Sequence, residues 1–214
     1  MALEPPAPRL RSELKRLLGV EVGADAAQAA FRAEIAFYLE HHLEGADERS
    51  LDRLRDRCAE VIVHALALDG RDLAAVREAM LGSLSFRAYP DVVPALRRLR
   101  AGGVRLVVAS NWDCSLPQVI EDAGLAALVD GAVPSATFGA AKPDPTVFEA
   151  ALALAGASPQ EAIHVGDSLD HDVEGARAAG VRGVLLDRDG GARRAGVETI
   201  GSLGELPSLV LDGS

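Results

Sequence analysis

The sequence has very little lysine. Of its 22 basic residues only two, Lys15 and Lys142, are lysines, and all the others are arginines. The 32 acidic residues outnumber the basic ones and give a formal net charge of −10. A protein that binds nucleic acid gathers Lys and Arg on one face, because phosphate neutralisation supplies its affinity. No basic run here is longer than a pair such as Arg97-Arg98, so the sequence argues against a nucleic-acid partner.

Cysteine and long apolar stretches are also scarce. Two cysteines, Cys58 and Cys114, cannot form the disulfide framework of a secreted protein, and no group of Cys and His has the spacing of a metal site. No stretch approaches the ~18 uninterrupted apolar residues of a membrane span, and the first residues contain no apolar signal core. We therefore expect a soluble cytoplasmic protein with no membrane partner, whose cysteines are small core residues.

The first part of the sequence has a helical hydrophobic period. Up to about residue 85, helical patterns are separated by Gly and Asp, and β-branched runs are almost absent. Asp25, Asp47 or Ser50, and Asp72 are candidate N-caps. The predicted helices cover residues 8–18, 25–43, 47–65 (or from Ser50) and 72–80. Residues 1–85 are therefore interpreted as a helical bundle.

From Tyr89 onward, short apolar strands alternate with helices. This pattern is typical of βαβ units, and hence of a parallel sheet covered on both faces. The predicted strands are residues 104–109, 132–134, 162–165, 183–186 and a weaker one at 197–200. The predicted helices are residues 91–100, 116–123, 145–154 and 172–179. The fold class is therefore α/β, with residues 86–214 forming a Rossmann-like core.

Polar residues Ser110 and Asn111 follow the first of these strands. In an open α/β sheet, ligands collect outside the carboxyl ends of the strands. A hydroxyl and backbone N–H groups at a strand-to-helix turn can hold an anion there. The alternative is an ordinary turn with an N-cap, since Ser and Asn are common in both.

The rare Lys142 lies in a proline-rich turn. Pro143 restricts Lys142 to extended backbone geometry, and Pro145 suits the first turn of the following helix. A compact ammonium neutralises a phosphate or carboxylate as a point charge, which a planar guanidinium cannot copy. A sequence that uses Arg almost everywhere else keeps Lys here, which favours an anion site over an exposed lysine in a turn.

Asp167, Asp170 and Asp172 follow a later strand within six residues of one another. Carboxylate oxygens next to a glycine that permits close backbone approach form a hard oxygen site suited to Mg²⁺. Asp172 could instead be only an N-cap, and Asp170 is expected to point to solvent. His164 and His171 lack the partner spacing of a transition-metal site and are expected to be structural.

In this order, Ser110-Asn111, Lys142-Pro143 and Gly166-Asp167-Ser168 through Asp172 resemble the motifs of the haloacid dehalogenase-like hydrolase superfamily. The resemblance implies a helical cap at residues 1–85 and a Rossmann-like core at 86–214. It also implies that Ser110 and Asn111 bind the transferring phosphoryl group and that Lys142 stabilises the nucleophile and the phosphate. In the last motif it implies that Asp167 is a Mg²⁺ ligand and that Asp172 supports the metal site.

The resemblance further implies a Mg²⁺-dependent phosphatase of a small phosphorylated metabolite. In that chemistry an aspartate forms an aspartyl-phosphate that water hydrolyses, while the metal and the lysine offset charge on the phosphoryl oxygens. Two carboxylates in the last motif favour this reaction over that of a metal-free haloacid dehalogenase, which is the less favoured alternative. Neither the substrate nor the oligomeric state follows from the sequence. Candidate cap residues for substrate contact are Arg32, Tyr38, His41 and His42.

One motif of the family is missing from the sequence. An apolar strand ending in Asp-x-Asp-x-Thr should precede the cap and supply the nucleophile, but residues 1–14 contain no such strand. Asp187-Arg188-Asp189 imitates the motif, but it follows the metal motif and has Gly191 where Thr is expected. The chain as written thus lacks the nucleophile. The alternative function is therefore a catalytically inactive phosphate-binding or regulatory protein.

The missing strand belongs in the middle of the sheet, between the strands that end at Ser110 and Val165. Without it, we expect a gap in which the flanking strands lose ladder partners unless they close up and pair. Our hypothesis is that the native protein begins about a dozen residues earlier, the length of a strand and a tight turn. Met1 would then be a misplaced start or a truncation.

Overall fold

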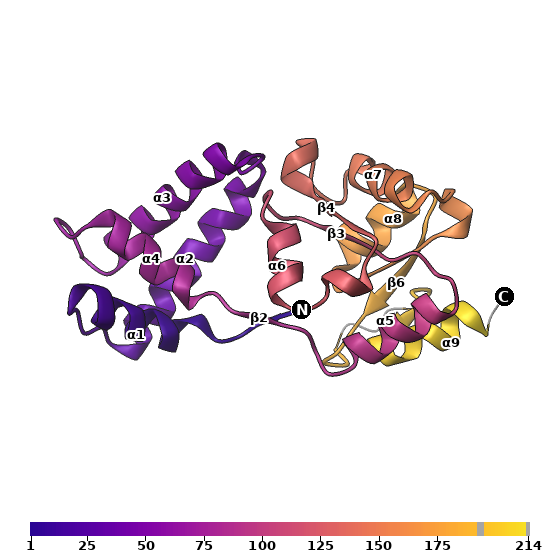
Figure 1. The fold of residues 1–214 in the computed structure, drawn as a ribbon, viewed down its shortest axis with the longest axis horizontal. Coiled ribbons are helices and arrows are strands. Elements are labelled where there is room, and N and C mark those ends of the chain that lie inside the picture. The colour runs from indigo at the N-terminus through magenta and orange to yellow at the C-terminus, as the bar shows by residue number, and fades with distance from the viewer. Residues whose placement is uncertain (192–194, 213–214) are drawn as a thin grey trace. The chain divides into compact units, whose positions relative to one another are not determined.

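The computed structural model describes residues 1–191 and 195–212 and divides into two compact units, Met1–Arg87 and Ala88–Ser214 (Figure 1). The first unit is helical. Its helices are α1 (Pro6–Leu18), α2 (Ala24–His41), the 3-10 turn η1 (His42–Glu44), α3 (Glu48–Ala65) and α4 (Leu73–Ser83). The four predicted helices are confirmed. A short antiparallel ladder that the sequence does not predict joins β1 (Ala2–Leu3) to β2 (Phe86–Arg87).

The helix starts of this unit follow local capping chemistry. Asp47 caps α3, and its carboxylate and the Ser50 hydroxyl form a reciprocal capping box. Asp72 caps α4 by accepting a hydrogen bond from the backbone of the first turn. The prediction for Asp25 is wrong, because α2 begins after Gly23 without a side-chain cap and Asp25 lies inside the first turn. A carboxylate there still faces the positive end of the helix dipole.

The core of the helical unit is closed. Helix α1 packs against α4 and α2, and α3 packs against α2 and α4. Leu10 and Leu14, one turn apart on α1, are fully buried. Phe31 of α2 and Leu54 and Ile62 of α3 are buried to the same extent. Apolar burial of this kind is the main source of stability in a helical bundle.

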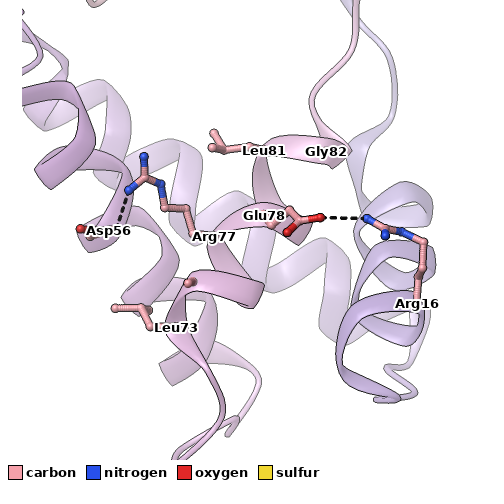
Figure 2. A pocket seen from close by; sticks show the side chains of 8 residues that line it. Arg16, Asp56, Leu73, Arg77, Glu78, Leu81 and Gly82 are labelled. Atoms are coloured by element: carbon pink, nitrogen blue, oxygen red, sulfur yellow. Dashed lines mark hydrogen bonds and ion pairs between the residues drawn. The ribbon is translucent and has the colours of Figure 1, made fainter. Parts of the chain in front are cut away.

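Charged side chains tie the outer surfaces of these helices together. Around a shallow hollow of the helical unit, Arg16 on α1 pairs with Glu78 on α4 at 3.2 Å, and Arg77 on α4 pairs with Asp56 on α3 at 2.9 Å (Figure 2). All four side chains are partly or largely exposed. Exposed pairs of this kind contribute about 0–1 kcal/mol each, so the apolar core is the larger stabilising term.

The second unit is the α/β unit. Its strands are β3 (Val107–Ser110), β4 (Gly131–Pro134), β5 (Ile163–Gly166), β6 (Arg182–Leu186) and β7 (Thr199–Ile200). Its α-helices are α5 (Val92–Ala101), α6 (Leu116–Asp122), α7 (Pro145–Ala155), α8 (Gly175–Ala178) and α9 (Leu206–Leu211). A π-helical turn, η5 (Leu169–Glu174), and the 3-10 turns η2 (Ala126–Leu128), η3 (Ser135–Phe138), η4 (Pro159–Glu161) and η6 (Leu203–Glu205) complete it.

The five predicted strands are confirmed with shifted ends, and one predicted helix needs correction. The first strand begins at Val107 and not at Val104. The segment predicted as one helix at residues 172–179 is the π-helical η5 followed by α8, and it begins at Leu169. Helix α9 is not predicted by the sequence. No helix among the described residues is both long and apolar enough to span a membrane.

The strands of the α/β unit form two separate parallel ladders. β3 pairs with β4, and β5 pairs with β6, which in turn pairs with β7. Among the residues that the structure describes, no ladder joins β3 to β5. The break lies between the strands that end at Ser110 and Gly166, as the sequence predicts, and these two strands do not pair with each other.

Helices cover both sides of these strands. Helices α7 and α8 lie on one side and α5 and α9 on the other (Figure 1). On the first side Phe148 of α7 and Ala176 of α8 form a buried cluster. On the second, Leu99 of α5 packs with Val184 of β6 and Leu206 of α9. The two ladders therefore share helical layers although their strands do not pair.

Candidate active site

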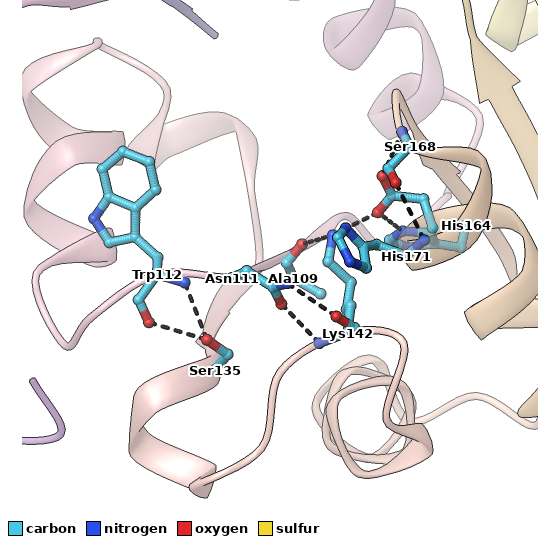
Figure 3. A network of polar contacts seen from close by, with 9 residues as sticks. Ala109, Asn111, Trp112, Ser135, Lys142, His164, Ser168 and His171 are labelled. Carbon is cyan, nitrogen blue, oxygen red and sulfur yellow. Dashed lines mark hydrogen bonds and ion pairs between the residues drawn. The ribbon is translucent and has the colours of Figure 1, made fainter. Parts of the chain in front are cut away.

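The carboxyl ends of β3 and β5 meet at the side chain of Lys142 (Figure 3). The Lys142 Nζ group donates to the backbone oxygen of Ala109 in β3, at 3.1 Å, and to Oδ1 of Asp172 in η5, at 2.5 Å. The exposed fraction of the side chain is 11% for Lys142 and 5% for Asp172. The structure thus brings together two of the predicted site residues, which are thirty positions apart in the sequence, as a buried ion pair.

Asn111 holds the backbone of Lys142 with both of its amide atoms. Asn111 Oδ1 accepts from the Lys142 N–H at 2.7 Å, and Asn111 Nδ2 donates to the Lys142 carbonyl oxygen at 3.0 Å. This paired contact fixes the loop that carries Lys142 against the end of β3. The prediction that Asn111 binds a phosphoryl group stays a prediction, and its side-chain amide is already used for positioning.

Asp172 has a hydrogen-bond partner on each of its oxygens. Besides Lys142, Oδ1 lies 2.9 Å from Nε2 of His164, and Oδ2 accepts from the Ser168 N–H at 3.0 Å. Burial alone would raise the pKa of Asp172. The hydrogen bond from His164, the charge and hydrogen bond of Lys142 and the Ser168 N–H outweigh burial and hold its pKa well below the usual range. Asp172 is therefore ionised throughout the neutral range.

The alternative of Asp172 as only an N-cap is wrong. Ser168 is the capping residue, because its side chain accepts from the His171 N–H at 3.1 Å. Asp172 lies inside η5 and points back toward Gly166. A Cβ atom added to Gly166 would lie 2.1 Å from Cγ of Asp172. Only glycine leaves room for the buried carboxylate at this strand end.

His164 and Ser135 are two site residues for which the sequence supplied no function. His164, in β5, reaches Asp172 and packs edge-on against the ring of Phe148, with ring centroids 5.1 Å apart. Ser135, fully buried after β4, accepts from the Trp112 N–H at 3.0 Å and thereby ties the turn after β3 to the neighbouring strand (Figure 3). The sequence does contain a signal that could have identified Ser135 as a site residue. Like Ser110, Ser135 stands at the carboxyl end of an apolar strand.

The carboxylates at the end of β5 allow a test of the implied Mg²⁺. Asp167 is exposed, whereas both oxygens of buried Asp172 accept hydrogen bonds from protein groups. The described residues contain no group of three or more His, Cys, Asp and Glu that could hold a metal ion. Mg²⁺ in phosphoryl-transfer sites takes one or two carboxylates, with waters and substrate phosphate completing its shell. Asp167 fits such a site as a direct ligand, and direct ligation by Asp172 stays a prediction.

The remaining predicted residues are placed as follows. Ser110 is half-buried at the end of β3, and Asp170 is exposed, as expected. Asp187, in the sequence that imitates the missing motif, accepts from the Gly190 N–H at 3.0 Å in a turn. Arg188 beside it pairs with Asp91 at 3.0 Å and thereby ties this turn to the start of α5.

The four cap candidates all lie on α2 or directly after it. Arg32 is exposed, Tyr38 and His41 are half-buried, and His42 is buried. Rings of the helix pack against one another: His41 stacks on Phe37 with centroids 4.1 Å apart, and His42 lies 6.2 Å from Tyr38. These contacts account for the histidines as packing residues of the helical unit. Substrate contact by any of the four stays a prediction.

Comparison with known proteins yields matches over most of the chain. A family model described as haloacid dehalogenase-like hydrolase matches residues 7–180. "Phosphatase MT3486" of Mycobacterium tuberculosis is 38% identical over 130 residues, which are 60% of this chain and 58% of that protein. The chain spans between about a third and three fifths of the length of the first curated relatives that it matches.

Solved structures resemble the chain over nearly its whole length. The crystal structure of a phosphatase from Thermococcus onnurineus matches with a TM-score of 0.63 and 26% identity, covering 95% of this chain and 87% of that one. The L-2-haloacid dehalogenase of Xanthobacter autotrophicus matches with a TM-score of 0.67 at 18% identity, covering 98% and 94%. The second likeness shows a shared fold alone.

Proposed function

Because the chain belongs to the haloacid dehalogenase-like hydrolases, we propose that it forms the core and cap of a Mg²⁺-dependent phosphatase of a small phosphorylated metabolite. Residues 86–214 are the core and residues 1–85 the cap. The observation that carries the proposal is the Lys142 ammonium, held at the carboxyl ends of β3 and β5 by Ala109 and Asp172. Strand carboxyl ends are where open α/β sheets bind their ligands.

The hydrogen-bonding capacity of Lys142 supports an anion as the ligand. An ammonium has three N–H groups, and two of those of Lys142 are used by Ala109 and Asp172. The third is left for an oxygen of the substrate phosphoryl group. Ser110, at the end of β3, is half-buried and supplies a hydroxyl for a second phosphoryl oxygen. Asn111 and Asp172 act by fixing the backbone and the side chain of Lys142.

Asp167 is the residue proposed to hold Mg²⁺. When bound, the ion offsets negative charge on the phosphoryl oxygens. Asp167 is exposed at the end of β5, so its carboxylate is accessible to an ion that arrives with the substrate phosphate.

We also propose that the protein works in the cytoplasm. Cys58 is buried and Cys114 is half-buried, and neither is in a disulfide among the described residues. Reduced cysteines suit a reducing compartment.

A phosphate-binding or regulatory protein without turnover is the second candidate. Nucleophilic catalysis needs a carboxylate that is available to attack phosphorus. Among the described residues, the one carboxylate bonded to Lys142 is Asp172, and both of its oxygens already accept hydrogen bonds. The binding function requires Lys142, Ser110 and Asp167 alone, whereas turnover requires a further aspartate at this site.

Calorimetric titration with inorganic phosphate, with and without Mg²⁺, tests the site assignment. We expect saturable binding that requires Mg²⁺ and weakens by at least about tenfold in Lys142→Met, the loss of one charge-assisted hydrogen bond. Asp167→Asn should remove the Mg²⁺ requirement together with the tight binding. Lys15→Met is the matched control and should bind phosphate normally, because Lys15 lies on α1 in an exposed pair with Glu21. Unchanged phosphate binding in a folded Lys142→Met protein contradicts the assignment.

Turnover assays separate the candidate functions. Phosphate release from an aryl phosphate that requires Mg²⁺ identifies a phosphatase. Phosphate binding without release under the same conditions identifies the binding protein. Metal-independent halide release from a 2-haloacid identifies a dehalogenase and contradicts both proposals.

A further inference from the structure

Strand β5 has one polar side chain, that of His164, among its four residues. Ile163 and Val165 are apolar and pack against the buried cluster that contains Leu99 of α5 and Leu206 of α9. Successive side chains of a strand point to opposite faces, so His164 lies on the other face, which α7 and α8 cover (Figure 1). An apolar residue would satisfy packing at this half-buried position. The imidazole therefore calls for a separate explanation.

The ring of His164 is held by the elements around it. Phe148, a buried residue of α7, meets it edge-on, with ring centroids 5.1 Å apart and an angle of 85° between the ring planes. The backbone of His164 belongs to the ladder between β5 and β6, where it is in register with Gly183. Packing and ladder together fix the direction in which the ring nitrogens point.

The ring of His164 makes its hydrogen bond to Asp172. Nε2 of His164 lies 2.9 Å from Oδ1 of Asp172, and the ring has no other hydrogen-bond partner among the described residues. Asp172 is ionised in the neutral range and its carboxylate can only accept, so Nε2 carries the hydrogen and donates it. Gly166, two residues along on the same face of β5, leaves the space that the Asp172 side chain fills.

His164 and Ser168 hold one oxygen each of the Asp172 carboxylate. His164 donates to Oδ1, and the Ser168 N–H donates to Oδ2 at 3.0 Å. One hydrogen bond to one oxygen leaves a carboxylate free to rotate, whereas a donor on each oxygen sets its plane. Oδ1 is also the oxygen that accepts from Lys142 at 2.5 Å. The carboxylate is therefore already oriented by protein groups where the ammonium meets it.

The orientation of Asp172 decides the direction of the Lys142 ammonium. One acceptor of Nζ, the Ala109 oxygen, is a backbone atom of β3, whereas the other belongs to a side chain that can rotate. The three N–H groups of an ammonium diverge at fixed angles. The two acceptors together therefore set the direction of the third N–H, and a rotation of Asp172 changes it.

We propose that His164 is a positioning residue of the anion site. It fixes the Asp172 carboxylate and, through that carboxylate, the direction of the Lys142 N–H that binds a phosphoryl oxygen. This role rests on the proposed function only in taking a phosphoryl oxygen as the ligand of Lys142. The orientation of Lys142 by His164 and Asp172 concerns contacts within the protein, so it can be measured without any ligand.

The first measurement is nuclear magnetic resonance of the whole chain carrying isotope-labelled lysine. The chain has only two lysines, so Lys15→Met identifies the signals of Lys142. A side chain held in one rotamer gives its two Hε protons different chemical shifts, whereas averaging over rotamers makes the shifts equal. We expect Lys142 to show two separate Hε signals in the natural chain and one merged signal in His164→Leu.

Two matched variants distinguish positioning from a general loosening of the fold. His164→Gln keeps an N–H donor close to the place of Nε2 and should keep the two Hε signals of Lys142 separate. Val184→Ala removes fully buried packing from β6 but none of the donors to Asp172, so it should also keep them separate. Merged signals in Val184→Ala would show that loosening alone releases Lys142 and would overturn the proposal.

The second measurement is calorimetric titration with inorganic phosphate in the presence of Mg²⁺. We expect His164→Leu to bind phosphate about tenfold more weakly than the natural chain, the effect of one lost hydrogen bond to a charged group. His164→Gln and Val184→Ala should bind within about threefold of the natural chain. If the natural chain binds no phosphate, the proposed function fails, and the resonance measurement still decides whether His164 orients Lys142.

Three results overturn the positioning role. The first is a merged Hε signal of Lys142 in the natural chain. The second is a pair of separate signals that persists in His164→Leu. The third is phosphate binding by His164→Leu that equals binding by the natural chain. His164→Val, which places a residue favoured in strands at this position, is a second variant without a donor, and the same outcomes apply to it if His164→Leu fails to fold.

Discussion

The two lysines of the chain show how the helical unit and the α/β unit differ. Lys15 pairs with Glu21 at 2.7 Å in the helical unit, and the exposed fractions of the two side chains are 67% and 78%. Lys142 pairs with Asp172 in the α/β unit at 2.5 Å, with exposed fractions of 11% and 5%. The contacts are of similar length. Because water screens the first pair and is excluded from the second, only the second has a large electrostatic effect.

The two units differ in how they use charged side chains. The helical unit has a closed apolar core and places its ion pairs at the surface, so its charges could change with little consequence for the fold. The α/β unit has two half-buried strands, and the charged network around Lys142 links their carboxyl ends. In that unit a buried polar network therefore adds to the apolar clusters that pack under the helices.

Removing each lysine in turn gives the largest expected difference between the units. Lys142→Met leaves the buried Asp172 carboxylate without its cation, and we expect the free energy of unfolding to fall by about 3–5 kcal/mol. Lys15→Met should change it by less than about 1 kcal/mol. The single tryptophan, Trp112, lies in the α/β unit, so its fluorescence during urea unfolding reports the effect of Lys142→Met, and far-ultraviolet circular dichroism, which also follows the helical unit, reports the effect of Lys15→Met. Equal effects of the two substitutions would contradict the comparison.

Glu34 is an exception in the helical unit, since it is a buried acid on α2. Burial raises its pKa to about 7, against a smaller opposing effect of a hydrogen bond with Cys58. Because the folded-state pKa exceeds the ordinary value of 4.5, protonated Glu34 stabilises the fold fully below about pH 4.5. That stabilisation, on the order of 3 kcal/mol, is lost as the pH rises through about 7.

The measurement is the free energy of unfolding of the helical unit against pH, followed by far-ultraviolet circular dichroism. Glu34→Gln is the matched control, because a neutral amide of the same size removes the titration. We expect the difference between the two proteins to grow from pH 5 to pH 8 in favour of the variant. Parallel profiles for the two proteins would show that Glu34 has no raised pKa.

Two valines of the α/β unit allow the effect of burial to be compared between neighbouring strands. Val165 of β5 and Val184 of β6 are partners in register, but Val165 is half-buried and Val184 fully buried. Val184→Ala should lower the free energy of unfolding by about 2 kcal/mol and Val165→Ala by about 1 kcal/mol, in proportion to the apolar area removed from water.

The smallest expected effect concerns a helix start in the helical unit. Asp47→Ala removes the side-chain partner of the Ser50 N–H, a 2.8 Å hydrogen bond. We expect a loss of about 1 kcal/mol, detected by circular dichroism during unfolding. Asp25→Ala is the control on α2, where no side-chain cap exists, and it should have a smaller effect. A larger effect of the control would mean that the helix dipole matters more here than capping.

The elements of the fold and the members of the site were predictable from the sequence to different degrees. Period and turn residues identified the four helices of the first unit and the five strands of the second, because both signals are local along the chain. Composition pointed to Lys142. What could not be predicted is which groups Lys142 would contact. Nothing in the order of residues indicates that the amide of Asn111 would hold its backbone.

His164 makes another contact that the sequence does not predict. Its spacing in the sequence gives it no metal partner and predicts a structural role. The structure places its ring nitrogen 2.9 Å from Asp172, within the network that holds Lys142. The contact depends on Gly166, which leaves space for the Asp172 side chain to fold back over the strand end. A glycine next to an aspartate is visible in the sequence, but the direction in which the aspartate turns is not.

The sequence by itself determined the alternation of helices and strands, the strand ends at which polar residues collect, and the family to which those residues in that order belong. These follow from residue chemistry and short-range spacing. Only the tertiary structure decided that Asp172 pairs with Lys142 and that the Asn111 amide holds the Lys142 backbone. The physical reason is that hydrogen bonds and burial depend on distances between residues about thirty or more positions apart, and these distances exist only once the chain has packed.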